Sequence, residues 1–494
     1  MKPLGTITMC FPHVDEDTRS ILQSVMDKAE NYADFTKRLC EKACSEKVTP
    51  VLQYFAFFHA YNMDMYKQME RLFHMDEKPP FIEPLYLANE LILGYEVDMK
   101  AMLKSLVSSM ETIPNDWLAC HLYLQWRLAA ETFDPETDTD VQSMNTLRER
   151  IENDMDFECF QPLMFGLDAY GLMLKGYHED AIKLYKKGLA LARKHDDLAL
   201  VANGLYFLAE SVKNYDESAA MDLMLEQDKI AEELGYTLGL ARTSLVRGRI
   251  MAYRGEYDAA LNHYLEYCEM TESIGHPAAI TNFSLLLLYN LMKNEEKALE
   301  YLASMKGKID GRKRHLALYH MHLAFVFMNV GNDAKAHTQL DTAKHLAIQS
   351  GIQGFLNLHQ LLEGIFEKEQ GDYQSATVTL ETLMNRLGEG DHLRRNLCLF
   401  HLADIEVETC LYEQVELSES WLNRFEAYTM EKDFPGFAAQ AKILRAKLFQ
   451  EHGENEKSLA LVKEVLRAAE SPSMMYLKEM LVMHIPELSS RSRL

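Results

Sequence analysis

The sequence is short of positive charge and of long apolar runs. It contains 51 Lys and Arg residues against 75 Asp and Glu residues, which gives a formal net charge of −24. Such a charge repels the phosphate backbone of nucleic acids, and the sequence has no concentrated basic segment to overcome that repulsion. The longest apolar run, Phe283 to Met292, is interrupted by Asn290 and covers about half of the roughly 20 residues that span a bilayer. We therefore expect neither direct nucleic-acid binding nor a membrane partner.

Residues that interrupt helices are also scarce. There are 13 prolines and 23 glycines in 494 residues, whereas Leu, Met, Ala, Glu and Lys are abundant. This balance favours long helices over strands. The eight cysteines are widely spaced, as in proteins of a reducing compartment. The composition predicts an all-α, cytoplasmic protein. The last three residues, Ser492 to Leu494, resemble a peroxisomal address, and that alternative stays open.

The motifs of common catalytic sites are missing as well. Gly307-Lys308 is followed by Ile309, so the phosphate-binding loop of an NTPase is absent. No Gly-x-Ser-x-Gly motif occurs. On a helix, His315 and His322 share a face while His320 points elsewhere, which does not suit a zinc site. We expect no enzymatic activity, no cofactor and no bound metal.

What the sequence does contain is a repeat, which is clearest at Gly371 to Ala376. A glycine that ends one helix is followed five residues later by a small residue that opens the next, here called the hinge residue. The hinge residues recur at intervals of 38 to 43 residues: Ala181, Ala219, Ala260, Ala298, Ala336, Ala376, Val415 and Ser458. Five residues before them stand Gly176, Asn214, Gly255, Lys293, Gly331, Gly371, Cys410 and Gly453. Five glycines among these eight positions indicate a left-handed turn after the first helix.

Two further offsets predict how the helices cross. Twelve residues before the hinge residue, six of the eight positions hold a small residue, such as Gly248 or Gly364. Four residues after it, seven of the eight hold an apolar or aromatic residue, such as Tyr264 or Leu380. Small residues that face large ones at fixed offsets predict closely packed helix pairs.

These residues resemble the tetratricopeptide repeat family, best at Arg254 to Ala260 and at Gln370 to Ala376. The resemblance implies a right-handed α-solenoid of antiparallel helix pairs, with degenerate repeats over 1–160, eight repeats over 161–470, and a capping helix with a tail over 471–494. The period exceeds the family's usual 34 or so residues, so longer helices are expected. Long-period repeats of this kind are similar to the repeat regions of some transcriptional activators.

Stacked helix pairs place their first helices along a concave wall. In this phasing the wall presents aromatic residues, methionines and an arginine pair. The predicted binding residues are Arg242, Arg249, Tyr253, Phe283, Met321, Phe325 and Tyr170. Such a wall suits an amphipathic helix or an extended peptide with an acidic anchor, although long helices can also bury the same residues as core.

Two functions follow from this wall. The first is a non-enzymatic scaffold that binds a protein or peptide in the concave groove. The alternative is a ligand-sensing regulatory module that responds to a small molecule or signal peptide and acts on a separate effector protein. Self-association into a homodimer is left open.

Overall fold

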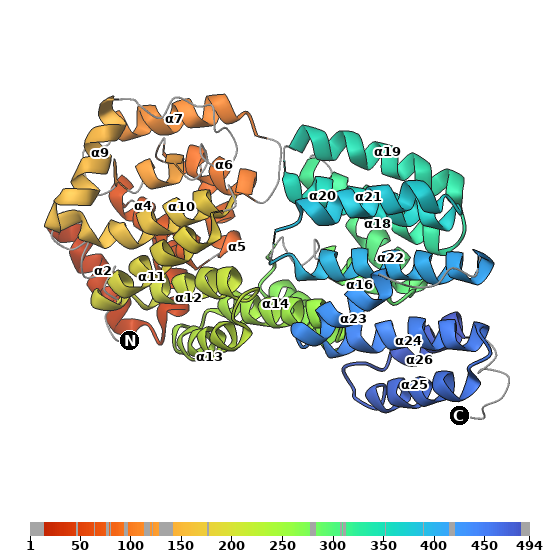
Figure 1. The fold of residues 1–494 in the computed structure, drawn as a ribbon. Helices are drawn as coiled ribbons and strands as arrows, with labels where there is room; N and C mark the ends of the chain where they lie inside the picture. Colours follow the sequence, from red (N-terminus) through yellow and green to blue (C-terminus); the bar gives the residue numbers. More distant parts are fainter. Residues whose placement is uncertain are drawn as a thin grey trace. The chain divides into compact units, whose positions relative to one another are not determined.

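The computed structural model describes residues 14–485, except 46–47, 64, 76–78, 80, 93–96, 113–118, 121, 128–141, 175–176, 277–282, 307–308, 310–312, 351, 389 and 414–419. Within these ranges every regular element is a helix (Figure 1). The tail tripeptide Ser492 to Leu494 and the first predicted turn glycine, Gly176, lie outside them. The all-α fold class is confirmed.

The N-terminal part consists of shorter helices. They are α2 (Glu16–Lys28), α3 (Tyr32–Ser45), α4 (Pro50–Asn62), α5 (Tyr66–Phe73), α6 (Ile82–Ile92), α7 (Met99–Thr112), α9 (Gln142–Asn153) and the 3-10 helix η2 (Met155–Phe160). The predicted change of repeat character near residue 160 stays a prediction.

From residue 161 the helices follow one another as pairs. The first helices are α10 (Gln161–Leu174), α12 (Leu198–Val212), α14 (Thr237–Arg254), α16 (Phe283–Leu291), α18 (Lys313–Asn329), α20 (Gln353–Glu369), α22 (His392–Glu413) and α24 (Pro435–Glu451). The second helices are α11 (His178–Lys194), α13 (Glu217–Leu234), α15 (Tyr257–Ser273), α17 (Glu295–Met305), α19 (Asp333–Ser350), α21 (Tyr373–Arg386), α23 (Trp421–Glu431) and α25 (Asn455–Ala468). A last helix, α26 (Leu477–His484), follows them. The predicted solenoid of antiparallel helix pairs is confirmed.

The turn between paired helices has the predicted conformation. Gly371 has a φ of 76°, which is the left-handed region that a side chain disfavours. The carboxylate of Asp372 then accepts a hydrogen bond of 3.1 Å from the backbone N–H of Ser375 and caps α21. Ala376, the hinge residue, is fully buried against the preceding helix. Glycine, cap and small residue therefore each have a separate physical role in the turn.

One predicted turn is wrong. Cys410 lies inside α22, which continues to Glu413, and the second helix of that pair begins only at Trp421. At another turn, Lys293 replaces the glycine but still has a φ of 51°, so the backbone keeps the left-handed conformation without glycine.

Small residues mark the crossings inside the pairs. A Cβ atom added to Gly248 would lie 2.5 Å from the ring of Tyr264, and one added to Gly364 would lie 2.8 Å from Leu380. Each pair of residues joins a first helix to its second helix at the predicted offsets. The first helices also contact one another in succession, from α16 through α18, α20 and α22 to α24. They therefore form a continuous layer, here called the first-helix layer.

Two compact units divide the chain. The first contains residues 1–243 and 267–279, and the second contains residues 244–266 and 280–494. Helices α14 and α15 each contribute residues to both units. No helix within the described ranges has the length and hydropathy that crossing a membrane requires.

Candidate functional site

The seven predicted binding residues all lie on first helices. Tyr170 is on α10, Arg242, Arg249 and Tyr253 are on α14, Phe283 is on α16, and Met321 and Phe325 are on α18. Tyr170 and Arg242 belong to the first unit, and the other five belong to the second. Their exposure separates them further, as described next. Their role in ligand binding stays a prediction.

Arg242 is the centre of a polar group in the first unit. Its Nη1 donates hydrogen bonds to the Tyr236 hydroxyl (2.6 Å) and to Oδ1 of Asn203 (3.1 Å). The guanidinium carbon lies 5.2 Å from the ring centroid of Tyr206, within the range of a cation–π contact. We call Asn203, Tyr206, Tyr236 and Arg242 the Arg242 group. Because two hydrogen bonds and an aromatic ring fix it, the guanidinium has a defined orientation.

Tyr170 lies near this group. The hydroxyl of Tyr185 has a pKa raised first by burial and then by the nearby Tyr170 and Tyr206 hydroxyls. Tyr170 and Tyr206 are both half-buried, as is Arg242. Tyr170 on α10 and Tyr206 of the Arg242 group therefore both lie close to Tyr185.

In the second unit most of the predicted residues are core. Tyr253 is buried, and its ring lies 5.7 Å from the rings of both His392 and Phe434. Met321 has no exposed surface, and Phe325 is also buried. These three side chains contact other parts of the protein and not solvent in this conformation. The closed-core alternative therefore describes this part of the wall.

Two predicted residues of the second unit keep some exposure. Phe283 is half-buried, and its ring stacks on that of His322 at 5.8 Å with an interplanar angle of 12°. Arg249 is half-buried too and lies seven residues after Arg242 on α14.

A cluster of charged residues lies on the later first helices and was not predicted from the sequence. Nζ of Lys368 on α20 lies 2.5 Å from Oδ2 of Asp404 on α22. Lys447 on α24 pairs with Glu408 on α22. His401 lies on the same stripe of α22 as Asp404 and Glu408, because the three positions follow a spacing of three and four residues. The spacing of these three polar residues on one stripe of α22 was the available signal.

The protonation of this cluster follows from burial and pairing. Burial raises the pKa of Asp404, but Lys368, His484 and Lys447 lower it more, so that its pKa is about 2 and the group is a carboxylate. Burial lowers the pKa of His401 to about 3, which keeps this imidazole neutral. In the part of the chain that the structure describes, no group of three or more His, Cys, Asp or Glu side chains is arranged so that it could hold a metal ion.

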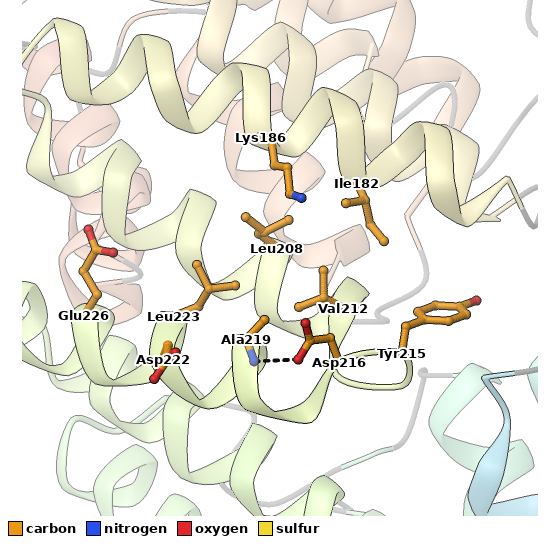
Figure 2. A pocket seen from close by; sticks show the side chains of 10 residues that line it. All are labelled: Ile182, Lys186, Leu208, Val212, Tyr215, Asp216, Ala219, Asp222, Leu223 and Glu226. Carbon is orange, nitrogen blue, oxygen red and sulfur yellow. Dashed lines mark hydrogen bonds between the residues drawn. The ribbon is translucent and has the colours of Figure 1, made fainter. Parts of the chain in front are cut away.

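A separate depression of about 470 Å³ lies between α11, α12 and α13 in the first unit. Figure 2 shows its apolar floor, to which Ile182, Leu208, Val212 and Leu223 contribute. Two of its three carboxylates have structural partners: Asp216 accepts the backbone N–H of Ala219, and Glu226 accepts two hydrogen bonds from Arg193. None of the predicted binding residues lines it.

Comparisons with known proteins concern the fold. No protein-family model matches the sequence, and no curated protein matches it. Solved structures with a similar course of the chain include a Rap protein in complex with the competence and sporulation factor, at 13% identity and a TM-score of 0.49, with 74% of this chain and 99% of that chain covered. Aspartyl phosphate phosphatase F from Bacillus subtilis matches at 14% identity and a TM-score of 0.39, with 84% and 95% covered. A signal transduction ATPase with a tetratricopeptide repeat sensor from Pyrococcus horikoshii matches at 14% identity and a TM-score of 0.27, with 94% and 74% covered.

Proposed function

We propose that this chain is a non-enzymatic scaffold that binds a protein or peptide on the first helices of its first unit, with an acidic group of the ligand bound by Arg242. The observation that carries the proposal is the fixed orientation of the Arg242 guanidinium. A guanidinium whose direction is set before binding loses little freedom when it pairs with a carboxylate. Its planar donors also match both oxygens of that carboxylate.

The surroundings of Arg242 support the same proposal. Tyr206 is half-buried and contacts the guanidinium, so it offers an aromatic surface beside the charged group. Large, partly exposed aromatic side chains and arginine dominate the binding energy of many protein interfaces. The chain as a whole carries a net charge of −24, so a fixed cation at Arg242 gives a local attraction for acidic ligands against a repulsive average charge.

The test is affinity capture from the native host with the full chain, followed by mass spectrometry. Proteins retained by the wild type are compared with those retained by Arg242→Glu. Reversal of the charge should reduce retention of the specific partner by about tenfold or more, since it replaces an anchoring contact with repulsion. Arg242→Lys keeps the charge but loses the planar donors, so it should retain an intermediate amount.

Lys229→Glu is the matched control, because Lys229 is exposed on the second helix α13. Its charge reversal should leave retention unchanged. Thermal melting of each variant shows whether folding is preserved. Equal retention by the wild type and by folded Arg242→Glu would overturn the proposal. The cytoplasmic location and the homodimer remain predictions from the sequence.

A further inference from the structure

The C-terminal residues 473–485, here called the strap, contact more of the second unit than a terminal cap requires. Four strap residues are buried: Tyr476, Leu477, Leu481 and Ile485. A cap needs to cover only the last pair, α24 and α25. The strap also reaches the turn between α14 and α15 and the first helix α22, as the following contacts show.

At its start the strap binds the α14–α15 turn. The Tyr476 hydroxyl donates a 2.7 Å hydrogen bond to the carbonyl of Gly255, and its backbone N–H donates to Asp258 at 3.0 Å. The backbone N–H of Asp258 donates in return to the carbonyl of Ser473 at 3.2 Å. The rings of Tyr476 and Tyr257 lie 4.7 Å apart. These contacts join segments more than 200 residues apart in the chain.

Further along, the strap lies on two first helices. Nε2 of Gln440 on α24 donates a 2.8 Å hydrogen bond to the Tyr476 hydroxyl. The ring of His484 lies 6.0 Å from Phe400 on α22, edge to face. Its Nδ1 stands 3.9 Å from Oδ1 of Asp404, which is too far for a hydrogen bond. The strap therefore lies on the first-helix layer against Gln440, Phe400 and Asp404, and we call the surface that it covers the groove.

The strap leaves two buried polar atoms of this groove without a hydrogen bond among the described residues. The Asp404 side chain is only 6% exposed, and its Oδ1 has no hydrogen-bond partner among the described residues. Nδ1 of His401 is buried without such a partner as well. A buried acceptor without a donor weakens the packing that covers it. A ligand with a neutral hydrogen-bond donor in the place of His484 could donate to Oδ1 of Asp404. It would add no further positive charge beside Lys368 and Lys447.

The strap itself has features of a ligand. Its helix α26 has 8 residues, fewer than an isolated helix needs to persist in water, so its fold depends on the groove. Its other side exposes Lys478 and Glu479 together with Val482 and Met483, whereas Leu477 and Leu481 are buried. It is thus a short amphipathic helix laid in a groove, which is a common mode of peptide recognition.

We propose that the strap is a detachable internal ligand, and that its groove on α22 and α24 binds amphipathic helical peptides of the same pattern when the strap leaves. The pattern is a tyrosine followed by leucines one and five residues later and a neutral hydrogen-bond donor eight residues later. This proposal rests on the proposed function, because it assumes that the protein binds peptides. It adds a second peptide site, in the second unit, to the one proposed at the Arg242 group.

The test uses the full chain with a specific protease site inserted between Glu470 and Ser471, so that the strap is cut from the folded protein without being removed. A fluorescent peptide of residues 473–485 is then titrated and its anisotropy measured. The cut chain should bind the peptide saturably, and the uncut chain should bind it at least about tenfold more weakly, because the tethered strap competes at high effective concentration. A Tyr476→Phe peptide, which lacks the hydroxyl, should bind about fivefold more weakly.

A peptide with His484→Asn supplies a neutral donor near Asp404 and should bind more tightly than the natural sequence. Thermal melting before and after cutting shows whether the second unit stays folded. Three results would overturn the proposal: loss of the folded state on cutting, no peptide binding to a cut chain that stays folded, or equal binding to cut and uncut chains. None of them depends on the cellular partner, so they leave the capture experiment on Arg242 unaffected.

Discussion

Replacing Gly364 by alanine tests the crossing on which the helix pairs are built. Gly364 lies on α20 and is buried where this helix meets α21. An added Cβ would lie 2.8 Å from both Cγ and Cδ2 of Leu380 and 3.4 Å from Cγ2 of Thr379. Leu380 is fully buried, and protein interiors are close-packed. The new methyl group must therefore push the two helices apart or force Leu380 out of its rotamer.

Two opposing effects determine how much Gly364→Ala changes the free energy of unfolding. Alanine favours the helix over glycine by about 1 kcal/mol. Overpacking a tight core costs about 1–3 kcal/mol. Because the contact involves two atoms of one buried side chain, one of them the branching carbon, we expect the upper part of that range and a net loss of about 1–2 kcal/mol. Gly364→Leu should lose more.

Thermal unfolding by calorimetry or circular dichroism measures the effect. One kcal/mol corresponds to about 2–4 °C in a domain of some 150–250 residues, so Gly364→Ala should lower the Tm by about 2–8 °C. Gly354→Ala is the control on the same helix, because its Cβ would meet only Arg394, at 3.9 Å. That variant should melt at the wild-type temperature or slightly above it. A Tm of Gly364→Ala equal to or above that of Gly354→Ala would refute the assigned crossing.

Two further predictions concern pH. Burial raises the pKa of Asp197, the cap of α12, from 3.8 to about 6; since this folded pKa lies above the unfolded one, ionisation destabilises the fold as the pH rises from about 4 to about 6, by up to about 3 kcal/mol. Asp197→Asn should therefore raise the Tm at pH 7.5 and leave it nearly unchanged at pH 4, whereas Asp216→Asn, at the exposed cap of α13, should change it little at either pH. Burial lowers the pKa of His484 below 6.5, and the positive charges of Lys447 on α24, Lys368 on α20 and Lys293 after α16 lower it further. Asp404 on α22 opposes this shift, and the neighbouring His401 is neutral. Because the docked strap favours the neutral imidazole, its affinity should fall as the pH drops below about 6.5, and in the peptide titration the His484→Asn peptide should lack this dependence.

The turns could be predicted because their causes are local. Gly371 requires a left-handed φ, Asp372 caps the next helix, and Ala376 fits a close crossing, and all three constraints lie within six residues. The prediction at Cys410 was wrong because a period was imposed on a longer helix. The local signal lay further on, where the Ser420 hydroxyl accepts the backbone N–H of Asn423 at 3.0 Å and caps α23.

Some contacts between neighbouring first helices could also have been predicted from the sequence. Arg242 bonds Asn203, which is 39 residues earlier, and Lys447 pairs with Glu408 at the same separation. Asn329 donates to the carbonyl of Asn290, again 39 residues away. One repeat period therefore places equivalent side chains side by side. Comparing polar residues at that separation would have found the contact of Arg242 with Asn203 and that of Lys447 with Glu408.

The closure of the second unit depends on the rotation between successive helix pairs, which the sequence of a single repeat does not reveal. The Cα of Gly436 and the carbonyl of Gly255 approach so closely that a side chain at Gly436 would collide with backbone, although the two glycines are several repeats apart. Whether such distant turns meet is set by the small rotation between successive pairs, summed along the array. A slight change in each rotation would open the wall and expose Tyr253. The same residues can therefore form core or groove, and in the closed arrangement the Tyr476 hydroxyl of the strap bonds both the Gly255 turn and α24.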